Sequence, residues 1–197
     1  MTTESCSIEN SGENSGAIVG NNYGSIVLNM QNVVKIPSLI SKLVRLLGDA
    51  CCEEEYATGG GIIKTFKPDE KIKYNCVIKY KCIIEEFSEY YSTCESYLNA
   101  YDDSNIRGKA KILKCVHMWY LEAKGLVLSE NKASPKDELD IIRDNSDRII
   151  DMVKYKIISI IQNSGDMNIT YQEDFELGIA CFICYCFMEC KILEKPL

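Results

Sequence analysis

The stretch from Leu177 to Met188 constrains the fold most, because it runs for twelve residues without a charge. A membrane-spanning helix needs about twenty apolar residues, so this run is too short to be one. Charges bracket it closely, at Glu173, Asp174, Glu176, Glu189 and Lys191. A helix that is apolar on all sides is buried on all sides. The sequence therefore predicts a C-terminal helix, opened by the capping box Thr170–Glu173, at the middle of a helical bundle.

Four earlier segments carry apolar residues at three- and four-residue spacing, which is typical of amphipathic helices. They run over about 37–56, 75–99, 105–128 and 134–163. In the second, the apolar positions form one seam of about three heptads, which favours packing along another long helix of this chain or of a partner. That seam is Val77, Tyr80, Ile84, Phe87, Tyr91, Cys94 and Leu98. The predicted fold class is mainly α, a bundle of about five helices in a domain spanning 37–197.

Residues 14–29 are a different kind of segment, an eight-residue unit that occurs twice. In the rows Asn14–Asn21 and Asn22–Asn29, asparagine, glycine, isoleucine, valine and asparagine recur in register. Each row joins a turn-prone opening to a short β-branched core, so we expect a short β segment, either a hairpin or paired rungs. The polar residues 1–13 ahead of it have little to bury and are expected to be a mobile N-terminus.

The repeat contains no charged residue, so nothing within it resists pairing with another strand. Stacked rows would place apolar residues and asparagines over their counterparts, as cross-β assemblies do. A hairpin docked on the helical body is the alternative. The predicted protein-interaction residues are Ile18, Val19, Asn21, Tyr23, Ile26, Val27, Leu28 and Asn29.

The charge balance argues against a surface built for nucleic acid, because the formal net charge is −7. The nearest approach to a basic patch is Lys64, Lys67, Lys71 and Lys73, which we interpret as a solvated loop and helix start. The glycines before Lys64 resemble a phosphate-binding loop only superficially, because Ile63 stands where that loop needs glycine. No direct contact with nucleic acid is expected.

Eleven cysteines raise the question of disulfides or a metal site. The first fifteen residues are polar and acidic, unlike a secretory signal, so we expect a reducing cytoplasm and free thiols. The cluster Cys181, Cys184, Cys186 and Cys190 could ligate a metal, but the aromatic and aliphatic residues between these thiols indicate dry packing. We therefore expect no metal and no other cofactor.

The only histidine, His117, is the natural candidate for a general base. Cys115 lies two residues away, which on a helix points the thiol to a different side. A cysteine distant in sequence could still meet the imidazole in space. We nominate no catalytic residue, and an enzyme using a thiol or metal around Cys181–Cys190 or His117 stays open as an alternative.

Several short stretches of the helical part carry a likeness to a known family. They are Lys71–Asn75, Tyr80, Ile83–Ser88, Tyr120, Lys124–Gly125 and Cys190–Pro196. Over roughly residues 71–196 the chain resembles the helical modules of bacterial ABC three-component conflict systems. In that family such modules commonly end an effector protein and are thought to couple it to an ABC-type ATPase and a middle component. The likeness implies a role in antiviral defence and supplies no catalytic residue.

Where that family has an effector domain ahead of the helices, this sequence has the octads, which resemble amyloid-type signalling motifs. We therefore expect a non-enzymatic adaptor or assembly subunit of a bacterial defence system, in the cytoplasm and without a membrane span. Its partners would be itself or another protein of the same system, giving homo- or hetero-oligomers. Besides the enzyme, a small-molecule sensor with a pocket between helices is the other alternative.

Overall fold

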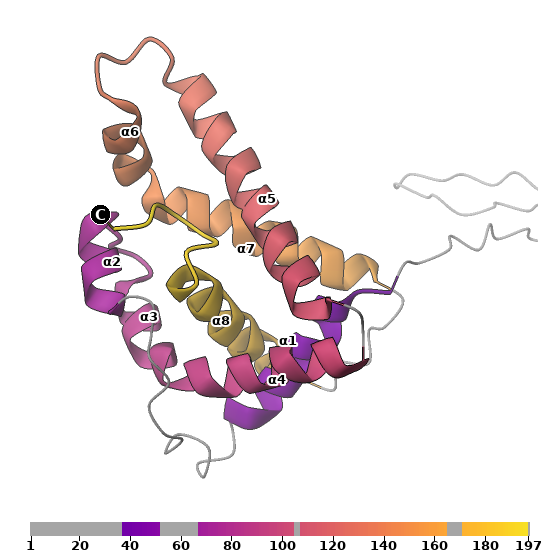
Figure 1. Ribbon diagram of the computed structural model, residues 1–197. Helices are drawn as coiled ribbons and strands as arrows, with labels where there is room; N and C mark the ends of the chain where they lie inside the picture. Colours follow the sequence, from indigo (N-terminus) through magenta and orange to yellow (C-terminus); the bar gives the residue numbers. More distant parts are fainter. Residues whose placement is uncertain (1–36, 52–66, 105–106, 165–170, 197) are drawn as a thin grey trace, which may run out of the picture. The chain divides into compact units, whose positions relative to one another are not determined.

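The computed structural model describes residues 37–51, 67–104, 107–164 and 171–196, and every structural statement below refers to those ranges. Their regular elements are all helical and belong to one compact unit, Lys35–Leu197 (Figure 1). In chain order they are α1 (Leu39–Cys51), α2 (Pro68–Tyr74), α3 (Lys81–Phe87), the 3-10 turn η2 (Ser88–Tyr90), α4 (Tyr91–Ser104), α5 (Gly108–Glu130), α6 (Glu138–Asp144), α7 (Ser146–Asn163) and α8 (Gln172–Met188). The mainly α class is confirmed, whereas the predicted β segment at 14–29 lies outside the described residues. Within these ranges no helix has both the length and the apolar character to span a membrane.

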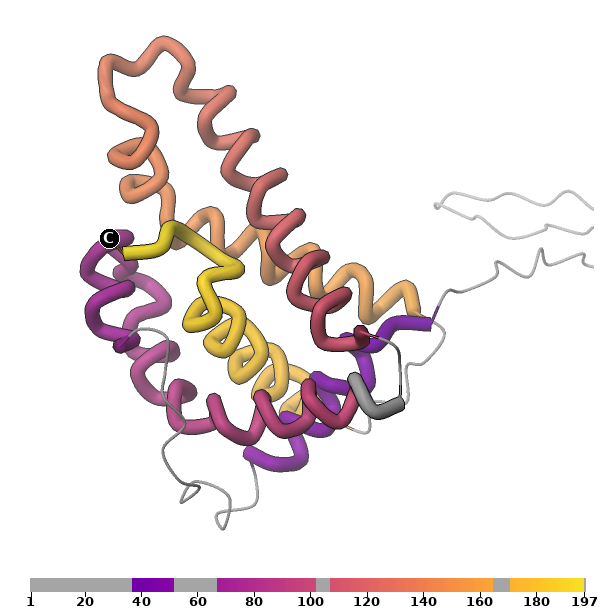
Figure 2. Tube along the Cα trace, in the orientation of Figure 1, coloured from indigo at the N-terminus to yellow at the C-terminus, as the bar shows by residue number. Residues whose placement is uncertain are grey.

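Helix α8 forms the centre of the core, as its uncharged run predicts. Gly178, Ile179 and every residue from Cys181 to Met188 are buried. The helix contacts α1, α3, η2 and α4, and Figure 2 shows it in yellow with these elements along its sides. The C-terminal helix is therefore buried by neighbours from the first half of the chain.

The backbones of α1 and α8 touch where each helix carries a glycine. A Cβ atom placed on Gly178 would lie 1.9 Å from the carbonyl oxygen of Val44, and one on Gly48 would lie 2.0 Å from that of Asp174. Real Cβ atoms do not approach backbone so closely, and backbone cannot rotate away as a side chain can. These two glycines therefore set the distance between α1 and α8.

Replacement of Gly178 by alanine should destabilise the protein by about 3 kcal/mol or more, because the added methyl forces the two helices apart. Gly125 of α5 is the matched control, since a Cβ there meets no atom within 4 Å. Gly125→Ala should stabilise by up to about 1 kcal/mol through helix propensity alone. Urea unfolding of both variants checks this, and equal effects of the two substitutions would contradict the packing argument.

Both α2 and α8 end in the same hydrogen-bonded motif, with a cysteine in the left-handed conformation. After α8, Cys190 has φ 52°, its N–H donates to the oxygen of Phe187 (3.1 Å), and the N–H of Lys191 donates to that of Cys186 (2.9 Å). After α2, Cys76 has φ 54° in the equivalent place. This is the Schellman arrangement, which usually places glycine there because other residues are strained in that conformation.

The carbonyl end of α8 also receives a buried lysine from α2. The Nζ atom of Lys71 donates to the oxygens of Phe187 and Ile192, the latter at 2.8 Å, and lies 4.4 Å from the centre of the Phe187 ring. Burial lowers the pKa of Lys71 to about 8, although the neighbouring Cys190 opposes that shift. The expectation of a solvated Lys71 is wrong, because only 1% of it is exposed. Lys67 and Lys73 are exposed as expected.

The folded pKa of Lys71 lies below the value of about 10.4 expected in an unfolded chain. The contribution of this group to stability is therefore complete above the unfolded value and is lost as pH falls through about 8. The difference in unfolding free energy between wild type and Lys71→Met should grow in favour of wild type from about pH 7 to about pH 9.5, with a slope approaching about 1.4 kcal/mol per pH unit.

Denaturant unfolding across that pH range measures the difference directly. Lys73→Met is the control, since Lys73 lies two residues away on the same helix and is exposed. Its profile should run parallel to wild type. A parallel profile for Lys71→Met as well would show that the buried amine does not titrate as described.

The segment after α8 is held between α2 and α5. The side chain of Asn75 bonds both backbone groups of Glu194, donating to its oxygen and accepting from its N–H, each at 2.9 Å. The Glu194 carboxylate accepts from Tyr120 and from Lys124 (2.8 Å) of α5. Partial burial opposes ionisation of Glu194, yet these donors outweigh it and lower its pKa. Positions that carry the family likeness therefore meet here in space.

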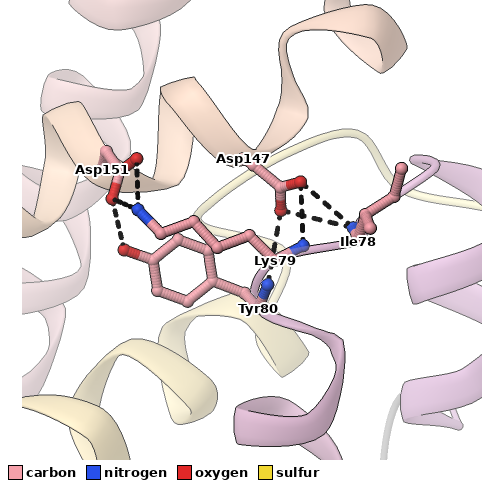
Figure 3. A network of polar contacts seen from close by, with 5 residues as sticks. All are labelled: Ile78, Lys79, Tyr80, Asp147 and Asp151. Carbon is pink, nitrogen blue, oxygen red and sulfur yellow. Dashed lines mark hydrogen bonds and ion pairs between the residues drawn. The ribbon is translucent and has the colours of Figure 1, made fainter.

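The single helix predicted over about 75–99 is wrong in two respects: residues 75–80 are not helical, and the 3-10 turn η2 separates α3 from α4. Asp147 of α7 accepts backbone N–H bonds from Ile78 (3.2 Å), Lys79 (3.0 Å) and Tyr80 (3.4 Å) (Figure 3). These N–H groups open α3, so a carboxylate distant in sequence caps it. Asp151, one turn further along α7, accepts from the side chains of Lys79 and Tyr80, each at 2.6 Å.

The helix predicted over 134–163 is likewise divided, into α6 and α7 around Asn145. The described ranges thus contain more and shorter helices than the five expected. Most of the seam residues are buried nonetheless, at Val77, Tyr80, Ile84, Tyr91, Cys94 and Leu98. The apolar positions were predicted correctly, and the breaks between them were not.

Candidate docking surface

Helix α5 has one buried face and one open face. Its buried face packs on α4, α6 and α7. The residues of that face are Ile112, Leu113, Val116, Trp119, Tyr120, Ala123 and Val127. This anchoring makes α5 a rigid support for whatever its other side presents.

The open face combines half-exposed apolar side chains with lysines. Met118 and Leu121 are 48% and 50% exposed and lie three residues apart, so they are neighbours on the helix. They line a shallow depression of about 470 Å³ together with other residues of α5. We call this set, Lys111, Lys114, Cys115, His117, Met118 and Leu121, the α5 face.

A second depression of about 440 Å³ adjoins the α5 face and shares Lys114 and His117 with it. Its remaining lining residues are Lys109, Ala110, Leu113 and Lys191. Lys191 comes from the segment after α8, and Lys109 also pairs with Glu95 of α4. In the described part of the chain, neither lining includes an acidic side chain. The surface is therefore locally basic on a chain whose net charge is −7.

His117 lies at the edge of α5, half-buried, with its Nδ1 atom 3.4 Å from the carbonyl oxygen of Lys191. Its ring is tilted against that of Tyr120, with 5.8 Å between the centroids. Cys115 is exposed on the same helix. The structure places His117 against the C-terminal segment, where it bounds the two depressions, rather than beside an orienting acid.

The cysteines singled out as metal ligands are spread along the buried α8. Cys181, Cys184 and Cys186 are buried, and Cys190 follows the helix end. Burial raises the pKa of Cys184 to about 12, which disfavours it as a nucleophile. Within the described ranges, no three side chains of histidine, cysteine, aspartate or glutamate gather as a metal site would require. These thiols pack as small apolar residues.

Two cysteines from different helices are in contact, which the sequence did not predict. The Sγ atom of Cys51, at the end of α1, lies 3.0 Å from that of Cys181 in α8. The two cysteines are 130 positions apart, so no local spacing links them. Only the close approach of α1 and α8 brings them together.

A third depression, of about 530 Å³, lies where α2 meets α3. Both acidic and basic side chains line it, including Asp69, Lys73, Lys81 and Glu85. A small-molecule sensor would need a pocket between helices, but the mixed charges of this depression favour no particular ligand.

The predicted interaction residues of the octads lie outside the described residues. They are Ile18, Val19, Asn21, Tyr23, Ile26, Val27, Leu28 and Asn29. Comparison with protein-family models, with curated proteins and with solved structures found no match for this chain. The likeness to three-component conflict systems therefore stays a prediction.

Proposed function

We propose that this protein is a non-enzymatic adaptor whose helical body docks a partner protein through the α5 face. The observation that carries the proposal is the pair of half-exposed apolar residues, Met118 and Leu121, set among lysines on a rigid helix. An apolar centre inside a polar rim is the usual anatomy of a protein interface. Methionine suits such a centre because its flexible side chain adapts to the partner.

The partner chemistry that fits this face is an acidic amphipathic helix. Apolar anchors three or four residues apart on such a helix would cover Met118 and Leu121. Its carboxylates would meet Lys111, Lys114 and Lys191, which line the two adjoining depressions. Complementary charge also raises the association rate, because opposite potentials steer the encounter.

Nucleic acid fits the same surface less well. A binder of phosphates spreads lysine and arginine along the path of the backbone. Here the lysines surround an apolar centre, and the chain as a whole is acidic. The apolar contact would contribute nothing to phosphate recognition.

The proposed setting is a bacterial defence system, with the octads pairing with themselves or with a partner that bears a similar motif. The likeness of residues 71–196 to conflict-system modules motivates that setting. Lys71, Asn75, Tyr120 and Lys124, which belong to the likeness, hold the segment that carries Lys191 to the second depression. The positions that suggest the family therefore help to shape the proposed docking surface.

Substitution in the α5 face should abolish binding of an acidic amphipathic helix. The probe is a labelled peptide with leucine at i, i+3, i+4 and i+7 and glutamate elsewhere, and fluorescence anisotropy measures its affinity. Combining Met118→Asp with Lys114→Glu should weaken binding by about a hundredfold or more, since both the apolar anchor and the opposite charge are lost.

The matched control combines Tyr155→Asp with Lys132→Glu, because both side chains are exposed and neither lines the α5 face. This control should bind as wild type does. Equal binding by all three proteins would contradict docking at α5, as would tighter binding of a single-stranded oligonucleotide of the same charge.

Charge placed inside the octads should abolish the proposed pairing. In the full chain, Val19→Lys together with Val27→Lys puts a cation in each row, which opposes strand stacking. The variant should lose binding to an immobilised peptide of residues 14–29, while its circular dichroism keeps the helical signal of wild type. Ile8→Lys lies outside the rows and should bind normally. Equal retention of all three proteins on the peptide would refute pairing through the repeat.

A further inference from the structure

Cys51 at the end of α1 and Cys181 of α8 approach closely, and the docking proposal makes no use of this contact. The two sulfur atoms lie 3.0 Å apart and are not bonded. A disulfide requires a separation of about 2.05 Å, so a movement of about 1 Å would close the bond. The backbone contacts at Gly48 and Gly178 hold α1 close to α8, and this close packing keeps the two sulfur atoms near each other.

The two thiols differ in access to solvent. Cys181 is 2% exposed, whereas Cys51 is partly open at the end of α1. The two thiols share a hydrogen bond, and this contact with Cys181 lowers the pKa of Cys51 despite its partial burial. That bond and burial raise the pKa of Cys181. Its greater exposure and its lowered pKa both favour Cys51 as the sulfur that ionises.

Among the described residues, the thiols near the pair are less open to an oxidant arriving from solvent than Cys51 is. Tyr90 of η2 donates to the carbonyl oxygen of Cys51 at 3.4 Å. Cys94 and Cys184 lie nearby but are buried, and burial raises the pKa of each thiol. A small oxidant would therefore meet Cys51 first.

We propose that Cys51 and Cys181 are a peroxide-reactive dithiol that closes to a reversible disulfide between α1 and α8. The Cys51 thiolate attacks hydrogen peroxide; a sulfur–oxygen bond forms, the oxygen–oxygen bond breaks, and the departing hydroxide takes a proton to become water. The Cys181 sulfur then attacks the sulfenic acid at Cys51. A sulfur–sulfur bond forms, the sulfur–oxygen bond breaks, and the oxygen leaves as a second water with the Cys181 proton.

In sum, the two thiols give two electrons to one peroxide, yielding one disulfide and two waters. The cross-link would fix α1 to the central helix of the core and close a loop of more than a hundred residues. A loop of that length gives a large entropic stabilisation, so the melting temperature should rise by roughly 5–10 °C on oxidation. A thiol reductant would reverse the change.

Peptide mapping of the full-length protein tests the proposal. After treatment with one equivalent of hydrogen peroxide and alkylation of the remaining thiols, mass spectrometry should find one linked peptide pair joining Cys51 to Cys181. Cys181→Ser should instead accumulate a sulfenic acid at Cys51, trapped by dimedone. Cys51→Ser should give neither product, and circular dichroism shows whether each variant keeps its helices.

Two controls locate the reaction. Cys82→Ser removes an exposed thiol far from the pair in sequence and should leave the link intact. Cys52→Ser removes the adjacent residue in sequence and should also leave it intact. Oxidation of Cys76 or Cys82 ahead of Cys51, or a link that passes through Cys52, would overturn the proposal. The outcome is independent of peptide binding at the α5 face, so each proposal fails separately.

Discussion

Burial of the C-terminal part of α8, from Cys181 to Met188, is the constraint on which the rest of the structure depends. A helix enclosed by its neighbours cannot send its last carbonyl groups to water, and unpaired buried carbonyls are costly. The chain meets this need twice, through the N–H groups of Cys190 and Lys191 and through the amine of Lys71. The segment after α8 must then turn back at once, and Asn75 and α5 hold it there. The position of Lys191, and with it the second depression, follows from how α8 ends.

The same constraint explains why α5 keeps an open face. Tyr120 and Lys124 bind the C-terminal segment, while the apolar side of the helix packs on α4, α6 and α7. With these contacts made, Met118 and Leu121 point outward and no described element covers them. Two half-exposed apolar residues on a well-anchored helix cost little in stability, and they would be the preformed centre of the proposed interface.

Local patterns in the sequence predicted the apolar positions well, since burial of one helix face needs only neighbours in sequence. The central α8 and the buried seam from Val77 to Leu98 follow from such patterns. The break at Val77–Tyr80 does not, because the carboxylate that stabilises it belongs to Asp147, about seventy residues away.

The helix ends at Cys76 and Cys190 were missed because glycine or asparagine is the usual marker of a left-handed terminus. Lys71 was misassigned because a charge in sequence indicates exposure unless buried acceptors surround it.

The candidate docking surface also has a part that the sequence could have indicated and a part that depends on the fold. The spacing of apolar residues could have indicated Met118 and Leu121 as a second apolar row on α5. Only the fold shows which of the two rows is buried against other helices. Three of the buried or half-buried ionisable groups are engaged in holding the structure. Lys71 binds carbonyl oxygens, Glu194 binds Tyr120 and Lys124, and Asp151 binds Lys79 and Tyr80. A group that must stay charged or bonded to hold the core is poorly suited to exchange protons with a substrate. Among the described residues, these structural roles are consistent with the proposal of a docking surface.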